Sequence, residues 1–141
     1  MRNNLIFAAL LLAVGCAAGR VEKKVMNVSE WKGQEGGSSK NHNHLIVYDA
    51  DAWSGVWTEV GQAPPAVDFS KSCALFVFAG ERPTGGWGIV FEEPVAKGDD
   101  LLVRYRITKP TGMATQAFTH PWRARVFPKP KGRLIVEYVP R

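Results

Sequence analysis

The second half of the chain is a succession of apolar and alternating segments with no helical pattern between them. Residues 74–79 are continuously apolar, which is typical of a strand buried on both faces. Residues 101–108 alternate apolar and polar side chains, which is typical of a half-buried strand. The expected strands are 45–48, 74–79, 87–92, 101–108, 113–119, 123–127 and 134–138, with a hairpin turn at 97–100. Because these strands follow one another directly, we expect antiparallel pairing.

One segment, between the expected strands 45–48 and 74–79, has the periodicity of a helix. Trp53, Val56, Trp57 and Val60 recur at the spacing that places side chains on a single helix face. Asp49 or Asp51 can cap the helix at its start, and Gly61 can end it. We therefore predict an α+β fold, a mainly antiparallel β sheet that is sandwich- or barrel-like, with one N-terminal amphipathic helix packed on it.

Residues 1–15 have the pattern of a secretory signal, with a basic start and a short apolar run. The run is shorter than the roughly 20 apolar residues that span a bilayer. Cys16 follows a small residue, which resembles the lipobox of bacterial lipoproteins, where this cysteine carries the lipid. The alternative is an ordinary signal that is cut nearby and discards Cys16. Either reading places the mature domain outside the cytoplasm, and the lipobox predicts a lipid-anchored protein of the bacterial cell envelope, periplasmic or outer-membrane-associated.

The composition changes after residue 43. Residues 16–43 are polar, and glycine and serine cluster between Gly33 and Lys40, which is typical of a loop or linker. We predict a lipid-anchored flexible tether over 16–43, in which Trp31 is a candidate for docking, and a folded domain over 44–141.

Charge and cysteine content exclude several functions. The 18 basic and 13 acidic residues give a net charge of +5 with no long basic run, so nucleic acid is not expected as a partner. An anionic envelope surface or an acidic partner remains compatible with this charge. The two cysteines, Cys16 and Cys73, provide no disulfide framework, and Cys73 is expected to be a buried, inert thiol in its apolar strand.

No catalytic pattern is present in the sequence. The serines match no nucleophile motif, and residues 80–86 lack the lysine of a phosphate-binding loop. His42, His44 and His120 are too few and too dispersed for the four ligands of a structural zinc site. We therefore predict no enzyme activity, no metal and no cofactor, with a hydrolase of unrecognised site as a minor alternative.

The turn between the first two strands of the second half is longer than a simple reversal requires. A hairpin needs only two turn residues, yet Arg82 to Gly86 form a longer tip stiffened by proline. The late segment His120-Pro121-Trp122 supplies another aromatic ring, and Trp and Arg are enriched at binding hot spots. The predicted partner-binding residues are Arg82, Pro83, Thr84, Gly85, Gly86, Trp87, His120, Pro121 and Trp122, with Arg82 and Trp122 as anchors. The alternative is a turn with no role beyond reversal.

The order of these motifs resembles the C-terminal domain of the PrcB lipoproteins, which are named as subunits of a bacterial surface protease complex. The resemblance covers roughly residues 45–138, and the Pro83-Thr84-Gly85-Gly86 turn is its best marker. Trp87 stands where an aromatic residue, commonly Tyr, follows the glycines in that family. The resemblance implies a non-catalytic protein that binds and stabilises an envelope partner, with a surface protease as the candidate.

A looser similarity connects the same loops to chagasin-type inhibitors of cysteine proteases. Residues 83–87, 110–112 and 120–122 echo the three loops of those inhibitors, although the spacings and the middle loop match poorly. This leaves protease inhibition as the alternative function.

Overall fold

The computed structural model describes residues 29–140, so the predicted signal segment and Cys16 lie outside the described residues. Within residues 29–140 no helix is long and apolar enough to cross a membrane. In chain order the elements are β1 (Glu30–Gly33), β2 (Asn43–Val47), α1 (Ala50–Glu59), β3 (Ser72–Phe78), β4 (Gly88–Phe91), β5 (Val95–Lys97), β6 (Asp100–Thr108), β7 (Trp122–Pro128) and β8 (Leu134–Tyr138).

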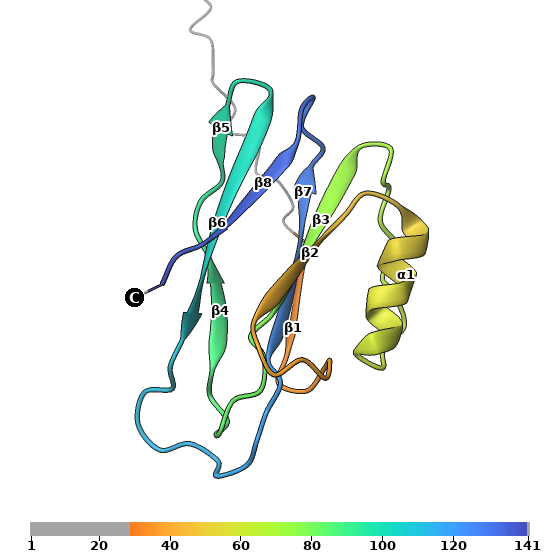
Figure 1. Cartoon of the computed structure of the whole chain (residues 1–141). Helices are drawn as coiled ribbons and strands as arrows, with labels where there is room; N and C mark the ends of the chain where they lie inside the picture. Colours follow the sequence, from red (N-terminus) through yellow and green to blue (C-terminus); the bar gives the residue numbers. More distant parts are fainter. Residues whose placement is uncertain (1–28, 141) are drawn as a thin grey trace, which may run out of the picture.

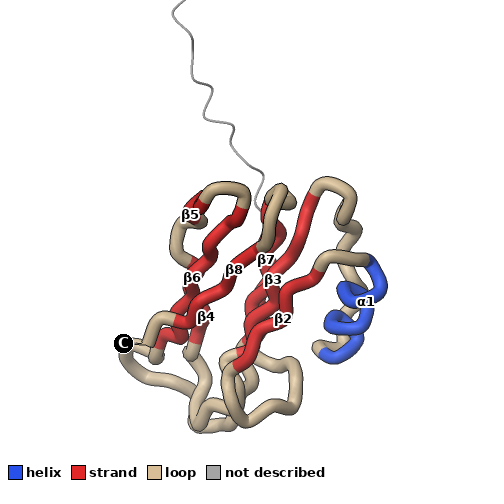
Figure 2. Tube along the Cα trace, turned by 45° about the horizontal axis from the view of Figure 1, so that its top comes forward, coloured by secondary structure: helices blue, strands red, loops and turns tan. Residues whose placement is uncertain are grey.

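The elements form three layers (Figure 1). One sheet has the strand order β1-β7-β3-β2, and α1 covers its outer face. The other sheet is centred on β6, which pairs with β4, β5 and β8. The predicted fold class is confirmed: the strands form a sandwich-like pair of mostly antiparallel sheets (Figure 2). Among residues 29–140 the one helix follows the second strand.

Strand β3 lies at the centre because both of its faces are apolar. Ala74, Phe76 and Phe78 face the helix, while Cys73 and Leu75 belong to the core between the sheets. Successive strand side chains point to opposite faces, so a continuous apolar run fills two cores at once. Each of these side chains is buried, as expected for the predicted central strand.

Helix α1 begins and ends at the residues that the sequence indicates. The Asp49 carboxylate accepts a hydrogen bond from the Ala52 backbone N–H at 2.8 Å, which satisfies one free donor of the first turn. Trp53 and Trp57 are buried against the sheet. Gly61 follows the helix with a φ of 73°, a conformation that glycine adopts without strain.

Strand β6 organises the second sheet. The hairpin predicted at 97–100 is present, with Gly98 at a φ of 60° between β5 and β6. One feature departs from the expected antiparallel pattern, because β8 runs parallel to β6 with Leu101 opposite Leu134. The reason is that β7 belongs to the other sheet, so the connection from β7 to β8 crosses between sheets rather than turning within one.

The predicted flexible tether is wrong over residues 30–43. Strand β1 pairs antiparallel with β7, and Trp31 packs against Trp53 and Trp57 with ring centroids 5.7 and 5.6 Å away. This aromatic burial holds the segment on the domain in spite of the glycine-rich sequence that follows it. The remaining tether residues, 16–28, lie outside the described residues.

The predicted strand at 113–119 is also absent. In this segment only Thr119 makes a β-type pairing, an isolated bridge to Arg82. Residues 109–121 instead form a long loop from β6 to β7 (Figure 1). Pro110 and Gly112 stand at the beginning of this loop and favour a turn over a continuing strand.

Candidate functional site

Three loops meet at one end of the sandwich, away from the β5–β6 hairpin (Figure 1). They are residues 34–42, 79–87 and 109–121, and we call them the loop end. Two of them contain the predicted partner-binding residues, so this end is the candidate site.

The turn at residues 82–87 is held by its own side chains. The Arg82 guanidinium donates to the Ala79 carbonyl at 3.0 and 2.7 Å and lies 4.7 Å from the centre of the Trp87 ring. The Trp87 indole N–H donates to the Thr84 hydroxyl at 3.2 Å. A cation above an aromatic face is attractive, so Arg82 is committed to supporting the turn rather than projecting from it.

Glycine is required at the tip of this turn. Gly86 has a φ of 79°, and a Cβ at this position would lie 2.7 Å from Cβ of Pro110. The chain therefore needs Gly86 both for its backbone conformation and for the close approach of the 109–121 loop.

Hydrogen bonds join the 79–87 turn to the other two loops. Arg82 and Thr119 exchange backbone hydrogen bonds of 2.8 and 2.9 Å, and the Thr119 hydroxyl donates to the Thr84 carbonyl at 2.8 Å. The His120 N–H donates to the Gln34 carbonyl at 2.9 Å, which brings in the first loop. The structure thus places the two sequence-predicted segments, 82–87 and 120–122, side by side.

Two of the predicted contact residues lie inside the protein. Trp122 is only 2% exposed and stacks on Phe76 at 5.1 Å between ring centroids, and Pro121 is fully buried. The Trp122 indole N–H donates to the Glu35 carbonyl at 3.1 Å. The expectation of a partly exposed Trp122 anchor is wrong, because β7 begins at this residue and its side chain points into the core beneath α1.

His120 remains accessible at the loop end, where it faces two carboxylates. Its Nε2 lies 3.7 Å from the Glu81 carboxylate and its Nδ1 lies 4.0 Å from that of Glu35. When the imidazole is protonated it forms ion pairs with both carboxylates, so His120 connects the 109–121 loop electrostatically to the other two loops.

The most exposed apolar side chains of this end are ones that the sequence analysis missed. Met113 is fully exposed and Phe118 is 68% exposed, both on the 109–121 loop. The sequence analysis predicts a strand over 113–119, in which one face would be buried. The signal that identifies them is their position between two chain-turning motifs, Pro110-Thr111-Gly112 and His120-Pro121, with no alternation of apolar and polar residues between the motifs.

A cleft of about 530 Å³ borders the loop end between the two sheets. Trp87, just before β4, and Lys32 on β1 line the cleft together with the buried Pro121 and Trp122. Trp87 is half-buried there, so of the predicted site residues it combines an aromatic surface with access to a ligand.

Burial limits the reactivity of Cys73, the cysteine within the described residues. Cys73 is fully buried, and burial raises the pKa of its thiol to about 11, so it is protonated at neutral pH. Between residues 29 and 140 no group of three or more His, Cys, Asp or Glu could hold a metal ion. His44 packs near Tyr105, and burial together with the charge of His42 lowers the pKa of its imidazole.

The comparison with known families bears on the first resemblance drawn from the motifs. Residues 73–128 match the family model PrcB C-terminal. The resemblance to this family is confirmed over these residues, which run from β3 through β7 and include the whole turn 82–87 and the loop 109–121. No curated protein and no solved structure matches the chain.

Proposed function

We propose that this chain is a non-catalytic subunit of a bacterial envelope protease complex, which binds and stabilises a partner protein through its loop end. The match to the PrcB C-terminal family supports a protease-complex-associated subunit. Lipid attachment at Cys16 holds the domain on the envelope, as the lipobox pattern indicates. A protease is the partner that the family resemblance favours.

The exposure of Met113 and Phe118 is the observation that carries this proposal. Met and aromatic side chains are enriched in the cores of protein interfaces. Leaving two of them in water on one loop has an unfavourable hydration free energy of about 0.8 kcal/mol for each exposed CH₂-sized group. A partner that covers them recovers this free energy.

The loop that carries these side chains is held in place before any partner binds. The Gly85 N–H donates to the Thr115 carbonyl at 2.9 Å, and Thr119 is buried with its hydroxyl bonded. Ordering a flexible loop on binding costs about 0.5–1.5 kcal/mol for each immobilised side chain. Pre-attachment to the 82–87 turn lowers this cost, so Arg82 and Gly86 act as positioning residues.

A pull-down with matched variants tests the contact surface. The double variant Met113→Ser with Phe118→Ser should lose the crosslinked partner from envelope extracts by at least tenfold, about 1.4 kcal/mol. The control is Val95→Ser with Leu45→Ser, which removes two other exposed apolar side chains, 45% and 43% exposed, from strands outside the loop end. Equal recovery with both double variants would reject the loop end as the contact surface.

A second measurement separates a stabilising subunit from an inhibitor. A stabilising subunit prolongs the lifetime of its protease without lowering peptidase activity, whereas an inhibitor lowers that activity in proportion to its concentration. The inhibitor alternative needs three projecting loops, and the third, at 120–122, has its aromatic ring in the core. Stoichiometric loss of peptidase activity would overturn the proposed stabilising role.

Anchoring has its own test. Cys16→Ala should abolish incorporation of a fatty-acid probe, because the lipobox offers no second acylation site, and a protein without a lipid chain has no strong membrane anchor. Label retained on the Cys16→Ala protein would exclude this cysteine as the attachment site.

A further inference from the structure

The two long sides of the sandwich differ in how closely their edge strands meet. On one side, residues just before and just after β2 reach β8. The His42 and Tyr138 rings lie 4.3 Å apart between centroids, and the Tyr48 hydroxyl accepts a hydrogen bond from the Leu134 N–H at 3.2 Å. On the other side, β1 borders the cleft of about 530 Å³ and a smaller hollow of about 180 Å³. The proposed function gives the edge of β1 no role.

The hydrogen bonds of β1 leave the outer edge of this strand unpaired. The Val126 N–H donates to the Ser29 carbonyl at 3.0 Å, which fixes the pattern of the antiparallel ladder with β7. Because bonded residues alternate in such a ladder, Trp31 bonds to β7, whereas Glu30 and Lys32 direct their backbone N–H and C=O groups away from it. Glu30 is exposed although only 29% of its side-chain surface is accessible, so much of that exposure comes from its backbone.

The edge of β4, which borders the same cleft, is already occupied by side chains. The Trp87 carbonyl accepts a hydrogen bond from the Gln34 amide at 2.9 Å, and the Ile89 carbonyl accepts one from the Arg123 guanidinium at 2.7 Å. Within residues 29–140 no side chain bonds in this way to the outer edge of β1. An unpaired strand edge is a template for a further strand, so of these two edges β1 is the one able to pair.

The charges beside this edge favour an anion. Lys32 lies directly opposite Arg123 in the β1–β7 ladder, and like charges in that position are destabilising. Both side chains line the cleft and the smaller hollow. The Glu30 carboxylate is shared between Arg123 at 2.6 Å and Arg125 at 3.2 Å, whereas Lys32 makes no ion pair within the described part of the chain. A carboxylate placed beside Lys32 and Arg123 would relieve their repulsion.

We propose that the free edge of β1 binds an extended, acidic segment of a partner protein. The segment adds as a strand and bonds to the outward backbone groups of Glu30 and Lys32. Its carboxylate opposite Lys32 enters the cleft beside Arg123. A lysine on an edge strand discourages pairing with apolar strands, so it selects a segment of opposite charge. The site does not include Met113 or Phe118, so it is separate from the proposed contact surface.

Strand alternation sets the residue pattern of the bound segment. Side chains opposite Glu30 and Lys32 share their face, and the intervening side chains fall on the face of Trp31. Trp31 is half-buried, with its ring edge-on to those of Trp53 and Trp57. An apolar side chain beside Trp31 covers more of this apolar surface. The favoured segment therefore alternates acidic and apolar residues.

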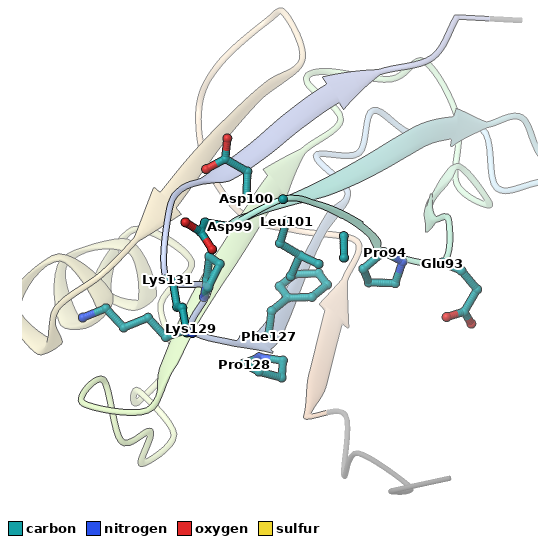
Figure 3. A pocket seen from close by; sticks show the side chains of 12 residues that line it. Glu93, Pro94, Asp99, Asp100, Leu101, Phe127, Pro128, Lys129 and Lys131 are labelled. Carbon is teal, nitrogen blue, oxygen red and sulfur yellow. The ribbon is translucent and has the colours of Figure 1, made fainter. Parts of the chain in front are cut away.

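Another cavity, of about 560 Å³, opens away from the loop end beside the β5–β6 hairpin, and its charges differ. Lys129 and Lys131 line it together with the carboxylates of Glu93 and Asp99 (Figure 3). Because both signs of charge are present, this cavity has no preference for an anion. Lys131 is exposed, as Lys32 is, so it provides a matched position for a control substitution.

Peptide titration tests the charge preference and the backbone pairing separately. The probe is a blocked, fluorescein-labelled hexapeptide of alternating glutamate and valine, and fluorescence anisotropy follows its binding to the full purified chain. The same peptide with lysine in place of glutamate should bind at least about tenfold more weakly. In an antiparallel pair the glutamate amides exchange bonds with Glu30 and Lys32, so N-methylation of these amides should also weaken binding at least about tenfold, whereas N-methylation of the valine amides should not. No binding of the glutamate peptide, or equal affinity for the two N-methylated peptides, would overturn the proposal.

Matched charge reversals locate the binding site. Lys32→Glu should lower the affinity for the glutamate peptide at least about tenfold, whereas Lys131→Glu, the same charge change at the other cavity, should leave it unchanged. Circular dichroism checks that both variants keep the fold. Equal loss of affinity in the two variants would mean that the peptide responds to net charge alone, and would reject the site at β1. Sedimentation velocity of the chain without peptide tests the other occupant: a dimer that Lys32→Glu dissociates would assign the edge to a second copy and overturn the acidic partner.

Discussion

Replacing Trp122 with phenylalanine tests whether this ring supports the fold or contacts a partner. The change removes the indole N–H that donates to the Glu35 carbonyl at 3.1 Å, a loss of about 0.5–1.5 kcal/mol. It also removes about three buried ring atoms, each worth about 0.8 kcal/mol by analogy with a CH₂ group. Together the free energy of unfolding should fall by about 3 kcal/mol, a large part of the ~5–15 kcal/mol typical of a domain.

Thermal unfolding followed by circular dichroism measures this loss. For a domain of this size about 3 kcal/mol corresponds to a fall in melting temperature of roughly 10–18 °C. Phe118→Ala is the matched control, because it removes an aromatic ring from the same end that is 68% exposed, and it should change stability by less than about 0.5 kcal/mol. A Trp122→Phe protein that melts within about 2 °C of the unchanged protein would refute the core assignment of this ring.

Three further outcomes follow from single contacts. Gly86→Ala should lower the free energy of unfolding in urea by about 1–3 kcal/mol, because φ is 79° and Pro110 blocks the new Cβ. Gly112→Ala is the control, with a φ of 84° but open space around the Cβ, and it should destabilise the protein less. Equal destabilisation by the two substitutions would contradict the close approach of Pro110 to Gly86. His44 has a lowered pKa in the folded state, chiefly from burial, so the unfolded chain takes up its proton first and stability should fall as pH drops below about 6.5. His44→Gln should flatten that slope, and an unchanged slope would exclude His44 as its source. Cys73 should react with iodoacetamide far more slowly in the native protein than in urea, because burial raises its pKa to about 11; rapid native labelling would show an accessible thiol.

The elements that can be predicted from the sequence are those whose order of apolar and polar residues fits one arrangement of buried and exposed faces. The helix has one apolar face and polar residues elsewhere, with Asp49 at its cap, so its position follows from periodicity alone. Strand β3 has apolar residues on both faces, and this pattern fits only a central position between two cores. In both cases local chemistry and tertiary environment agree.

The elements that were missed depend on contacts between distant residues. Strand β1 has only four residues, and its position depends on Trp31 packing against a helix about twenty residues later. The parallel pairing of β8 depends on β7 belonging to the other sheet, which no local pattern indicates. Neighbouring proline and glycine residues are compatible with either a loop or a strand end, which is why the strand predicted at 113–119 is wrong.

The same contrast holds for the candidate site, whose segments can be found from the sequence but whose solvent exposure depends on distant contacts. The sequence singled out the turn 82–87 and the segment 120–122, and these do lie together, because the backbone pairing of Arg82 with Thr119 joins them. Their exposure could not be predicted, since the same tryptophan is suited to a core or to an interface.

Because Trp122 is buried, its role at the loop end is to fix the loops in place and not to contact a partner. A tryptophan stacked on Phe76 and bonded to the loop residue Glu35 fixes the start of β7 and the 34–42 loop to one rigid core. The 109–121 loop ends at that anchored point and is pinned again at Thr119. The loop between these fixed points presents Met113 and Phe118 to solvent. Their hydration is unfavourable, and their exposure does not stabilise the isolated domain. The buried residues therefore supply the geometry and the exposed residues supply the binding surface, which is why substitutions at Trp122 should change melting temperature while substitutions at Phe118 should change partner recovery.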